Sequence, residues 1–272
     1  MLRIGVTGPR GRLGSELVRR GCLPIDADVT GFQVIAGAVV ATAPDVIVHC
    51  AACTDVDACE RHVTLAARVN AEGTQLLGRA FRGPIVYIST DYIFDGRAGP
   101  YAEDATPNPL GVYGWSKLGG EIALRNRGNA RDLIVRTTML FDAASSNFVT
   151  RVLARLRAGE TVRLPVDLYG SPTYVPYLAD GILAAIERGV TGVVNLAGSC
   201  VVTRYAWGWM IADKWGFDTD LVLTDLSERV NSAPRPHLAG LLVDKARALG
   251  LPIGDPLDGL EEMHALETME AR

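Results

Sequence analysis

The fold of this 272-residue chain is decided near its start, in residues 2–14, LRIGVTGPRGRLG. A strand-like apolar run is followed by Gly8, Gly11 and Gly14, and a helical pattern begins at Leu13. Glycines at such a junction let the chain turn tightly and let backbone N–H groups approach a pyrophosphate, which the helix N-terminus also attracts. A plain glycine-rich turn is the alternative, but the position directly after the first strand favours a dinucleotide site.

Beyond this turn, short apolar runs alternate with helical patterns. The runs at 45–48, 85–88 and 133–136 are mostly continuous, as expected for parallel strands covered on both faces, and helical patterns at 56–81 and 112–125 separate them. This order predicts an α/β fold with a doubly wound parallel sheet of the Rossmann type. Residues 21–43 should hold a second strand and helix, but a proline breaks the apolar run, so we expect a truncated or irregular unit.

The alternation weakens after about residue 141. A helical pattern at 148–156, a loop rich in proline and glycine at 165–176 and a strand-like run at 193–196 follow. We predict a dinucleotide-binding domain over residues 1–145. Residues 146–272 are predicted to form a smaller C-terminal substrate-binding lobe, interleaved with the last sheet strands.

The composition narrows the function classes. The chain is 48% hydrophobic and 21% charged with a net charge of −4, and it has no run of basic residues, which argues against a nucleic-acid partner. No stretch reaches the roughly 20 apolar residues of a membrane span, and the start lacks a signal-peptide pattern, so we expect no membrane partner and a cytoplasmic location. Cys50, Cys53, Cys59 and His62 have a zinc-like spacing, but buried cysteines on a strand and a helix are the favoured interpretation, and we predict no metal.

Two further patterns carry chemistry. Tyr113 and Lys117 are four residues apart and therefore share one helix face, where a Lys ammonium is expected to lower the pKa of the phenol and allow it to protonate a carbonyl oxygen. Thr90 lies in Ser-Thr-Asp, directly after an apolar run, at the carboxyl end of a predicted parallel strand where sites gather. A solvated helix face and a simple loop cap are the alternatives.

In this order, the glycine turn, the hydroxyl residue and Tyr-x-x-x-Lys resemble the extended short-chain dehydrogenase/reductases. Residues 69–77, VNAEGTQLL, are similar to the Asn-x-x-Gly-Thr helix of those proteins. The resemblance narrows to the dTDP-4-dehydrorhamnose reductase family and related sugar-nucleotide reductases. It extends from the first strand to about residue 250. The segments that carry it are 43–48 (APDVIV), 89–96 (STDYIFDG), 108–114 (NPLGVYG), 136–138 (RTT), 170–174 (GSPTY) and 235–236 (RP).

The resemblance implies an oxidoreductase of deoxysugar biosynthesis, in which NADPH or NADH reduces the C4 keto group of a nucleotide-linked 4-keto-6-deoxy sugar. Thr90, Tyr113 and Lys117 would be catalytic, with Lys117 also holding the nicotinamide ribose. The implied substrate contacts are Thr90, Asp91, Met139 and Arg235. The implied cofactor contacts are Gly8, Gly11, Arg12, Leu13, Gly14, Asp28, Val29, Ala51, Ala52, Cys53, Tyr113 and Lys117.

Some positions separate this chain from its relatives or leave alternatives open. Sugar-nucleotide dehydratases read Thr-Asp-Glu where this chain has Tyr92, which favours reduction. Met139 replaces a Trp that touches the sugar in the resembling reductases, so the particular sugar stays open.

The cofactor choice and the activity also keep alternatives. Asp26 or Asp28 would favour NADH, and Arg10 or Arg12 would suit the 2′-phosphate of NADPH. A cofactor-binding regulatory subunit without turnover and an epimerase are the alternative functions. A homodimer is the candidate assembly.

Overall fold

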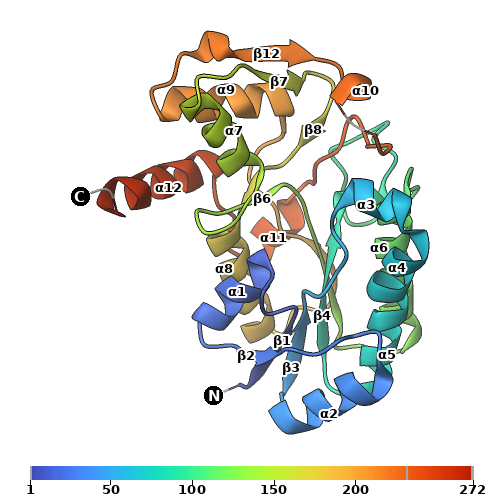
Figure 1. The fold of residues 1–272 in the computed structure, drawn as a ribbon. Helices are drawn as coiled ribbons and strands as arrows, with labels where there is room; N and C mark the ends of the chain where they lie inside the picture. Colours follow the sequence, from blue (N-terminus) through green and yellow to red (C-terminus); the bar gives the residue numbers. More distant parts are fainter. Residues whose placement is uncertain (1, 231, 271–272) are drawn as a thin grey trace.

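The computed structural model describes residues 2–230 and 232–270. A parallel sheet carries helices on both faces, and a smaller group of elements lies beyond one end of it (Figure 1). This arrangement confirms the predicted doubly wound α/β fold. Within the described part of the chain, no helix combines the length and the apolar character needed to cross a membrane.

All neighbouring strands of the main sheet run parallel. The order reverses on either side of β1, which is typical of dinucleotide-binding sheets and places their ligands at the carboxyl ends of the strands. From one edge to the other, the strands are β10 (Gly192–Asn195), β5 (Leu133–Thr137), β4 (Ile85–Thr90), β3 (Val46–His49), β1 (Ile4–Thr7) and β2 (Leu23–Ile25).

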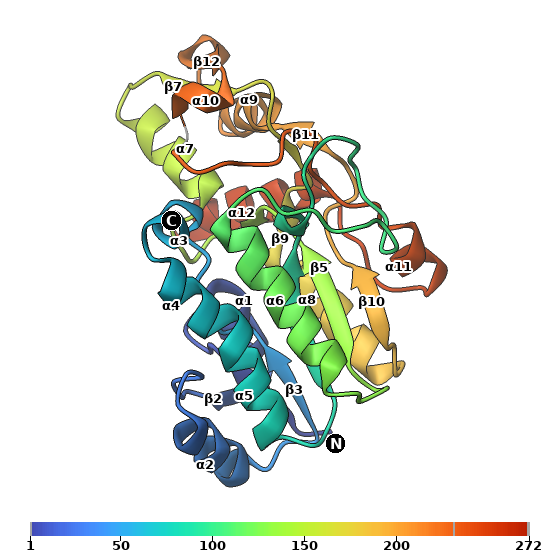
Figure 2. The same cartoon turned by 90° about the vertical axis from the view of Figure 1, so that its right-hand side faces the viewer.

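The strands are apolar at successive positions because a hydrophobic core covers each face of the sheet. In β3, Val46 and Val48 pack on one side and Ile47 on the other, as the two-residue period of a strand requires. Figure 2 shows α5 and α6 in front of the strands and α1 and α8 behind them. One face is covered by α2 (Phe32–Thr42), α5 (Gly73–Ala80) and α6 (Val112–Asn126), the other by α1 (Arg12–Arg19), α8 (Val175–Glu187) and α11 (Asp244–Ala248).

Residues 21–43 form a short unit, as expected. Pro24 is exposed in β2, which lies at the sheet edge, where a strand tolerates the missing N–H of proline. Helix α2 follows and buries Ile35 and Val39.

The helical pattern over residues 56–81 is confirmed as helical structure, but it is interrupted. The chain forms α3 (Val56–Arg61), α4 (Val63–Ala67), a π-helical turn η1 (Arg68–Glu72) and α5. His62 has non-helical φ and ψ of −127° and 57°, which separates α3 from α4. The side chain of Asn70 in the π-helical turn accepts from Cys53 N at 2.8 Å and donates to Cys53 O at 3.0 Å. A tertiary contact to the loop after β3 therefore accompanies the irregular turn, which helical periodicity does not reveal.

A second core lies beyond the carboxyl end of the sheet and centres on the buried Trp207. Its elements include α7 (Phe148–Arg157), β7 (Val162–Pro165), α9 (Arg204–Lys214), β12 (Val222–Asp225) and α12 (Pro256–Glu270). The remaining elements are β6 (Leu140–Phe141) paired with β9 (Thr173–Tyr174), β8 (Tyr169–Gly170) paired with β11 (Val202–Thr203), the turns η2 (Asp91–Ile93) and η3 (Thr219–Leu221), and α10 (Ser227–Val230).

Candidate active site

A cleft of about 1000 Å³ lies between the carboxyl ends of the sheet strands and the second core. Its lining brings together the glycine turn, the end of β4, the start of α6 and residues from α7, β7 and α9. Segments far apart in the sequence therefore meet where an open α/β sheet is expected to bind its ligands.

The glycine turn has the geometry of a pyrophosphate cradle. Gly8 has φ of +64°, and a Cβ there would meet the backbone of Ala51 at 2.8 Å. A Cβ on Gly14 would collide with the carbonyl oxygen of Gly8. Helix α1 begins directly after Gly11, and no side chain of the described residues caps it. Its first N–H groups are therefore free to bind phosphate oxygens, so this turn fits a dinucleotide.

Four residues, Arg10, Arg12, Asp26 and Asp28, are candidates for contact with the adenosine ribose. The side chains of Arg12 and Asp28 are held by other partners. The Arg12 guanidinium donates to Ser145 Oγ at 2.9 Å and lies 3.2 Å from Asp142 Oδ2. Asp28 accepts from the backbone N and the hydroxyl of Thr30, at 2.9 and 2.8 Å. Arg12 thus ties the glycine turn to the segment before α7, and Asp28 stabilises its own turn.

The other two residues form an exposed pair beside the glycine turn. Arg10 Nη2 lies 2.9 Å from Asp26 Oδ1, and both side chains are more than half exposed. Asp26 directly follows β2, whose Ile25 is level with Thr7 at the end of β1. An acidic residue at this place is the usual partner of an adenosine ribose, and a nearby arginine accommodates a 2′-phosphate.

The remaining cofactor residues expected from the sequence lie around this end of the sheet. Val29 is buried against Gly73, where a Cβ would meet Val29 Cγ2 at 2.8 Å, which explains the glycine of Asn-x-x-Gly-Thr. Seven of the twelve predicted cofactor residues line the cleft: Gly11, Arg12, Leu13, Gly14, Ala52, Tyr113 and Lys117. The lining of its described part does not include the other five, which are Gly8, Asp28, Val29, Ala51 and Cys53.

The three predicted catalytic residues converge on the cleft. Thr90 ends β4, while Tyr113 and Lys117 lie one turn apart at the start of α6. The Thr90 hydroxyl donates to Asp91 Oδ1 and accepts from Tyr92 N, both at 3.2 Å, and it lies near enough to the Tyr113 phenol to lower the phenol's pKa. The Lys117 ammonium lies over the Tyr87 ring, 4.1 Å from its centroid.

The electrostatics of this group differ from the sequence expectation. Burial raises the pKa of Tyr113 above its usual range, and its hydrogen bond with Thr90 opposes that rise only in part. Burial also lowers the pKa of Lys117 to about 7, although Glu121 raises it. The expected lowering of the Tyr113 pKa by Lys117 is therefore wrong for this arrangement, because desolvation of the phenol makes the largest contribution to its pKa.

A buried ion pair supports this part of the site. Glu121, one turn beyond Lys117, and Arg136 at the end of β5 are 0% and 1% exposed. Glu121 Oε1 accepts from Ser89 Oγ at 2.6 Å and from Arg136 Nε at 3.0 Å. The pair thereby joins α6 to the ends of β4 and β5 beneath Thr90.

Asp91 and Tyr92 follow Thr90; Asp91 is buried and Tyr92 is half-buried. Burial raises the pKa of Asp91, against hydrogen bonds from Thr138 and the backbone of Gly240. The Tyr92 ring meets the Tyr113 ring edge-on, with centroids 5.5 Å apart. Against the effect of burial, the neighbouring Asp57 and Tyr92 raise the pKa of Arg235.

Arg235 is fixed by an ion pair. Its Nη2 atom lies 3.0 Å from Oδ2 of Asp57 in α3, and this contact holds the pKa of Asp57 well below its usual range. Oδ1 of Asp57 accepts from Ser232 Oγ at 2.8 Å and from Ala233 N at 2.9 Å. The sequence did not single out Asp57, because the contact joins residues almost 180 positions apart.

Met139 lines the cleft in a strained conformation. Its φ of +48° is rare for a residue other than glycine, and its side chain packs where a Cβ on Gly170 would be. Strained residues gather at functional sites, which agrees with the predicted substrate contact.

The sequence analysis also missed the arginines on the far wall. Arg151, Arg155, Arg163 and Arg204 line the cleft together with Arg12 and Arg235. The helical spacing of Arg151 and Arg155 could have indicated one shared face, but only the fold shows that this face meets the cleft.

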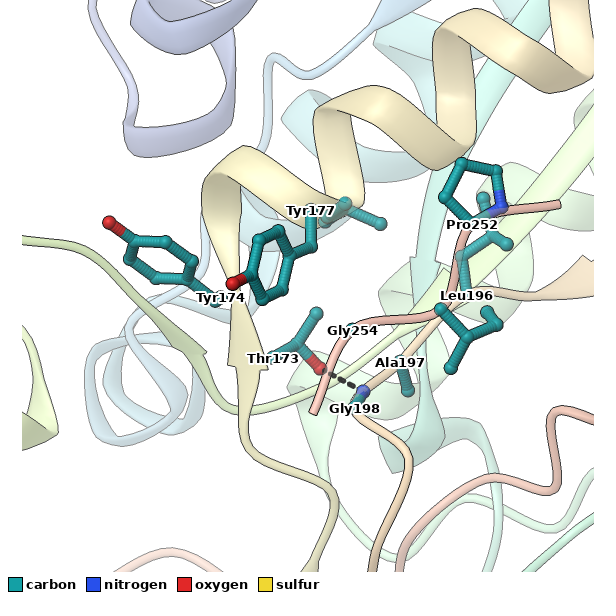
Figure 3. A pocket seen from close by; sticks show the side chains of 10 residues that line it. Thr173, Tyr174, Tyr177, Leu196, Ala197, Gly198, Pro252 and Gly254 are labelled. Carbon is teal, nitrogen blue, oxygen red and sulfur yellow. Dashed lines mark hydrogen bonds between the residues drawn. The ribbon is translucent and has the colours of Figure 1, made fainter. Parts of the chain in front are cut away.

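A much smaller hollow lies under the C-terminal segment (Figure 3). Its volume of about 10 Å³ has room for little more than one water molecule. The Thr173 hydroxyl accepts from Gly198 N at 3.1 Å beside it, and Tyr177 donates to Glu262 at 2.7 Å. This hollow is a packing feature between α8 and the residues around Pro252.

The cysteine cluster has a different geometry from a zinc site. Cys59 Sγ lies 3.5 Å from Cys53 Sγ, and all five cysteines are free. Among the described residues, no three His, Cys, Asp or Glu side chains are grouped so that they could hold a metal ion.

Fold and site together define a short-chain dehydrogenase/reductase of the extended type. The family model described as the RmlD substrate binding domain matches residues 2–265. The chain belongs to this family, that of the dTDP-4-dehydrorhamnose reductases.

Individual relatives agree with this assignment. The chain is 35% identical over 255 residues to a dTDP-4-dehydrorhamnose reductase of Mycobacterium tuberculosis, covering 86% of this chain and 81% of that protein. It is 33% identical to a dTDP-4-keto-6-deoxy-D-glucose reductase of Streptomyces niveus, covering 90% of each. The crystal structure of dTDP-4-dehydrorhamnose reductase from Bacillus anthracis in complex with NADP superposes with a TM-score of 0.91 at 28% identity, covering 97% of this chain and 99% of that one.

Proposed function

We propose that this protein is an NAD(P)H-dependent reductase that converts the C4 keto group of a dTDP-linked 4-keto-6-deoxy sugar to a hydroxyl. The observation that carries the proposal is the convergence of Thr90, Tyr113 and Lys117, with the glycine turn, on the lining of one cleft of about 1000 Å³. Family membership and the names of the relatives support the same substrate class.

The roles follow from the chemistry of the side chains. When bound, the reduced dinucleotide supplies the hydride for C4. Tyr113 donates its phenolic proton to the carbonyl oxygen, and Thr90 hydrogen-bonds the same oxygen and orients it. Lys117, one helix turn from Tyr113, would hold the nicotinamide ribose. The glycine turn and the N-terminus of α1 bind the dinucleotide pyrophosphate.

Other parts of the sequence prediction enter this proposal unchanged. Thr90, Asp91, Met139 and Arg235 contact the substrate. Residues 146–272 form the substrate-binding lobe, interleaved with the last sheet strands. The protein acts in the cytoplasm, and a homodimer is its candidate assembly.

The test is consumption of the reduced cofactor. Purified protein is mixed with NADPH or NADH and a dTDP-4-keto-6-deoxy sugar, and absorbance at the reduced-nicotinamide band is followed with analysis of the sugar product. Loss of absorbance and formation of a 4-hydroxy sugar are expected. Cofactor binding without consumption would favour the regulatory-subunit alternative, and sugar inversion without net consumption would favour epimerisation.

A further inference from the structure

Two cysteines face each other where the loop after β3 leads into α3. The Cys59 thiol on α3 lies 3.5 Å from Cys53 Sγ and 3.7 Å from the Cys53 carbonyl oxygen. Asp55 caps α3 between them, because its side chain accepts from Ala58 N at 2.8 Å. A disulfide has an S–S length of about 2.05 Å. The two sulfurs therefore need to approach by only about 1.5 Å, a shift that side-chain rotation within a folded loop can supply.

The two thiols differ in their access to solvent. Cys53 is half-buried, whereas Cys59 is 0% exposed. Burial, and next its contact with Cys53, raises the pKa of Cys59 to about 12. Because the thiolate is the form that reacts with oxidants, Cys59 is a poor first target. The difference gives the pair two roles, in which Cys53 meets the oxidant and Cys59 resolves the product.

The other three cysteines are poorer targets. Burial raises the pKa of Cys22, Cys50 and Cys200, which lowers the fraction of thiolate at neutral pH. A disulfide also needs a second sulfur within reach, which Cys53 has in Cys59. Oxidation is therefore expected to select this pair.

The backbone of Cys53 is tied to the active site. Asn70 binds both its N–H and its carbonyl oxygen, at 2.8 and 3.0 Å. Nδ2 of Asn70 also donates to Ser116 Oγ at 2.8 Å, and Ser116 donates to the carbonyl oxygen of Tyr113 at 2.8 Å. The residues on either side of Cys53 line the cleft. A covalent bridge to α3 restricts the position of Cys53 and therefore acts on a loop that faces the cleft.

We propose that Cys53 and Cys59 form an oxidation site for a small peroxide, and that the resulting disulfide weakens binding of the dinucleotide at the loop after β3. The site goes beyond the proposed reductase activity, since formation of the disulfide needs no turnover. Only its effect on the dinucleotide rests on the proposed function.

The chemistry balances in two steps. The Cys53 thiolate attacks one oxygen of hydrogen peroxide, the O–O bond breaks, and hydroxide leaves and takes up a proton to form water, so that Cys53 becomes a sulfenic acid. The Cys59 sulfur then attacks the Cys53 sulfur, the S–O bond breaks, and the hydroxyl leaves with the Cys59 proton as water. Two electrons thus pass from the thiols to the peroxide. A dithiol such as dithiothreitol reverses the bridge by thiol–disulfide exchange.

The experiment compares reduced, oxidised and re-reduced protein. The folded wild type is treated with hydrogen peroxide, the excess is removed, and the free thiols are counted, with an expected fall from five to three. Cleavage at Asp55 and Asp57 separates the two cysteines, so mass spectrometry should find a linked pair of peptides. Calorimetric titration with NADP⁺ should give a dissociation constant raised roughly 5-fold or more, the lower end of usual coupling between sites. Dithiothreitol should restore both measurements.

Three variants test the assignment, each compared with its own reduced form. Cys53→Ser should lose both the linked peptides and the effect of peroxide on NADP⁺ affinity. Cys59→Ser should instead accumulate a sulfenic acid at Cys53, which dimedone traps. Cys200→Ser is the matched control, because Cys200 is also half-buried but lies in the loop after β10, and it should respond to peroxide as the wild type does. Thermal unfolding of the reduced variants shows whether the fold is retained, and Cys53→Ser changes only the half-buried partner.

Three results would overturn the inference: no link between Cys53 and Cys59 in the folded wild type, a link that leaves NADP⁺ affinity unchanged, or a loss of affinity that persists in Cys53→Ser. Its failure is distinct from failure of the proposed function. If the link forms and weakens NADP⁺ binding but the reduced protein never consumes cofactor, the inference stands and the reductase proposal falls. If turnover occurs and peroxide leaves the two thiols unlinked, only the inference falls.

Discussion

Replacing Glu121 by Gln should destabilise the protein strongly, although the two side chains have almost the same shape. Glu121 is fully buried and accepts hydrogen bonds on both carboxylate oxygens, from Ser89, from Arg136 and, at Oε2, from Arg125 at 3.0 Å. The amide of Gln keeps one acceptor but turns the other oxygen into a donor that faces guanidinium N–H groups. Arg136 would then keep one amide oxygen, the Glu103 carbonyl oxygen and the Phe94 ring as partners, but it would lose the carboxylate charge that balances its own.

The magnitude follows from the burial of Arg136. Removing one partner of a buried ion pair costs about 3–5 kcal/mol, because the remaining charge is left without compensation. An ordinary domain has a free energy of unfolding of roughly 5–15 kcal/mol, so the substitution removes a large share of it.

Arg125 offers the matched control, because it contacts the same carboxylate from a side chain that is 49% exposed. Arg125→Gln should cost only about 0.2–1 kcal/mol, as is usual for exposed pairs.

Urea denaturation followed by circular dichroism measures both variants. A double variant, Glu121→Leu with Arg136→Met, should be less destabilised than Glu121→Leu alone, because it removes both charges together. The reasoning would be refuted if Glu121→Gln cost less than Arg125→Gln, or if the double variant were as unstable as the sum of its two single changes.

Three further outcomes are expected. Tyr113→Phe should lower turnover by about 10²–10⁴-fold with cofactor affinity unchanged, and equal kcat in both proteins would contradict the role of Tyr113 as the acid. Burial lowers the pKa of Lys117 to about 7, whereas an ordinary lysine has a pKa near 10.4. Between these two pH values the unfolded state binds more protons than the folded state. The free energy of unfolding that Lys117 contributes therefore rises with pH in this window. Lys117→Met should therefore show a shallower rise of unfolding free energy with pH than the wild type, and parallel curves would argue against the lowered pKa. Asp26→Asn should shift the ratio of the two dissociation constants toward NADPH and Arg10→Gln toward NADH, as measured by titration of each cofactor; equal changes for both cofactors would indicate that the pair is only structural.

The sequence predicted most of the framework because the relevant signals are local. Continuous apolar runs, the glycine turn and the helical patterns at 112–125 and 148–156 depend on neighbouring residues, and the structure confirms them. The break in the expected helix over 56–81 was not predictable in this way. It accompanies the hydrogen bonds of Asn70 with Cys53, a contact that exists only once the loop after β3 is in place.

By itself, the sequence determined the doubly wound sheet, the order of the site motifs and the pairing of Tyr113 with Lys117, since strand and helix periods fix which side chains share a face. Only the tertiary structure decided the electrostatics and the extent of the site. Burial raises the pKa of Tyr113 and lowers that of Lys117. The packing of α7, β7 and α9 brings arginines that are distant in the sequence to one cleft. Desolvation and convergence depend on how separate elements pack, which the spacing of residues along the chain does not encode.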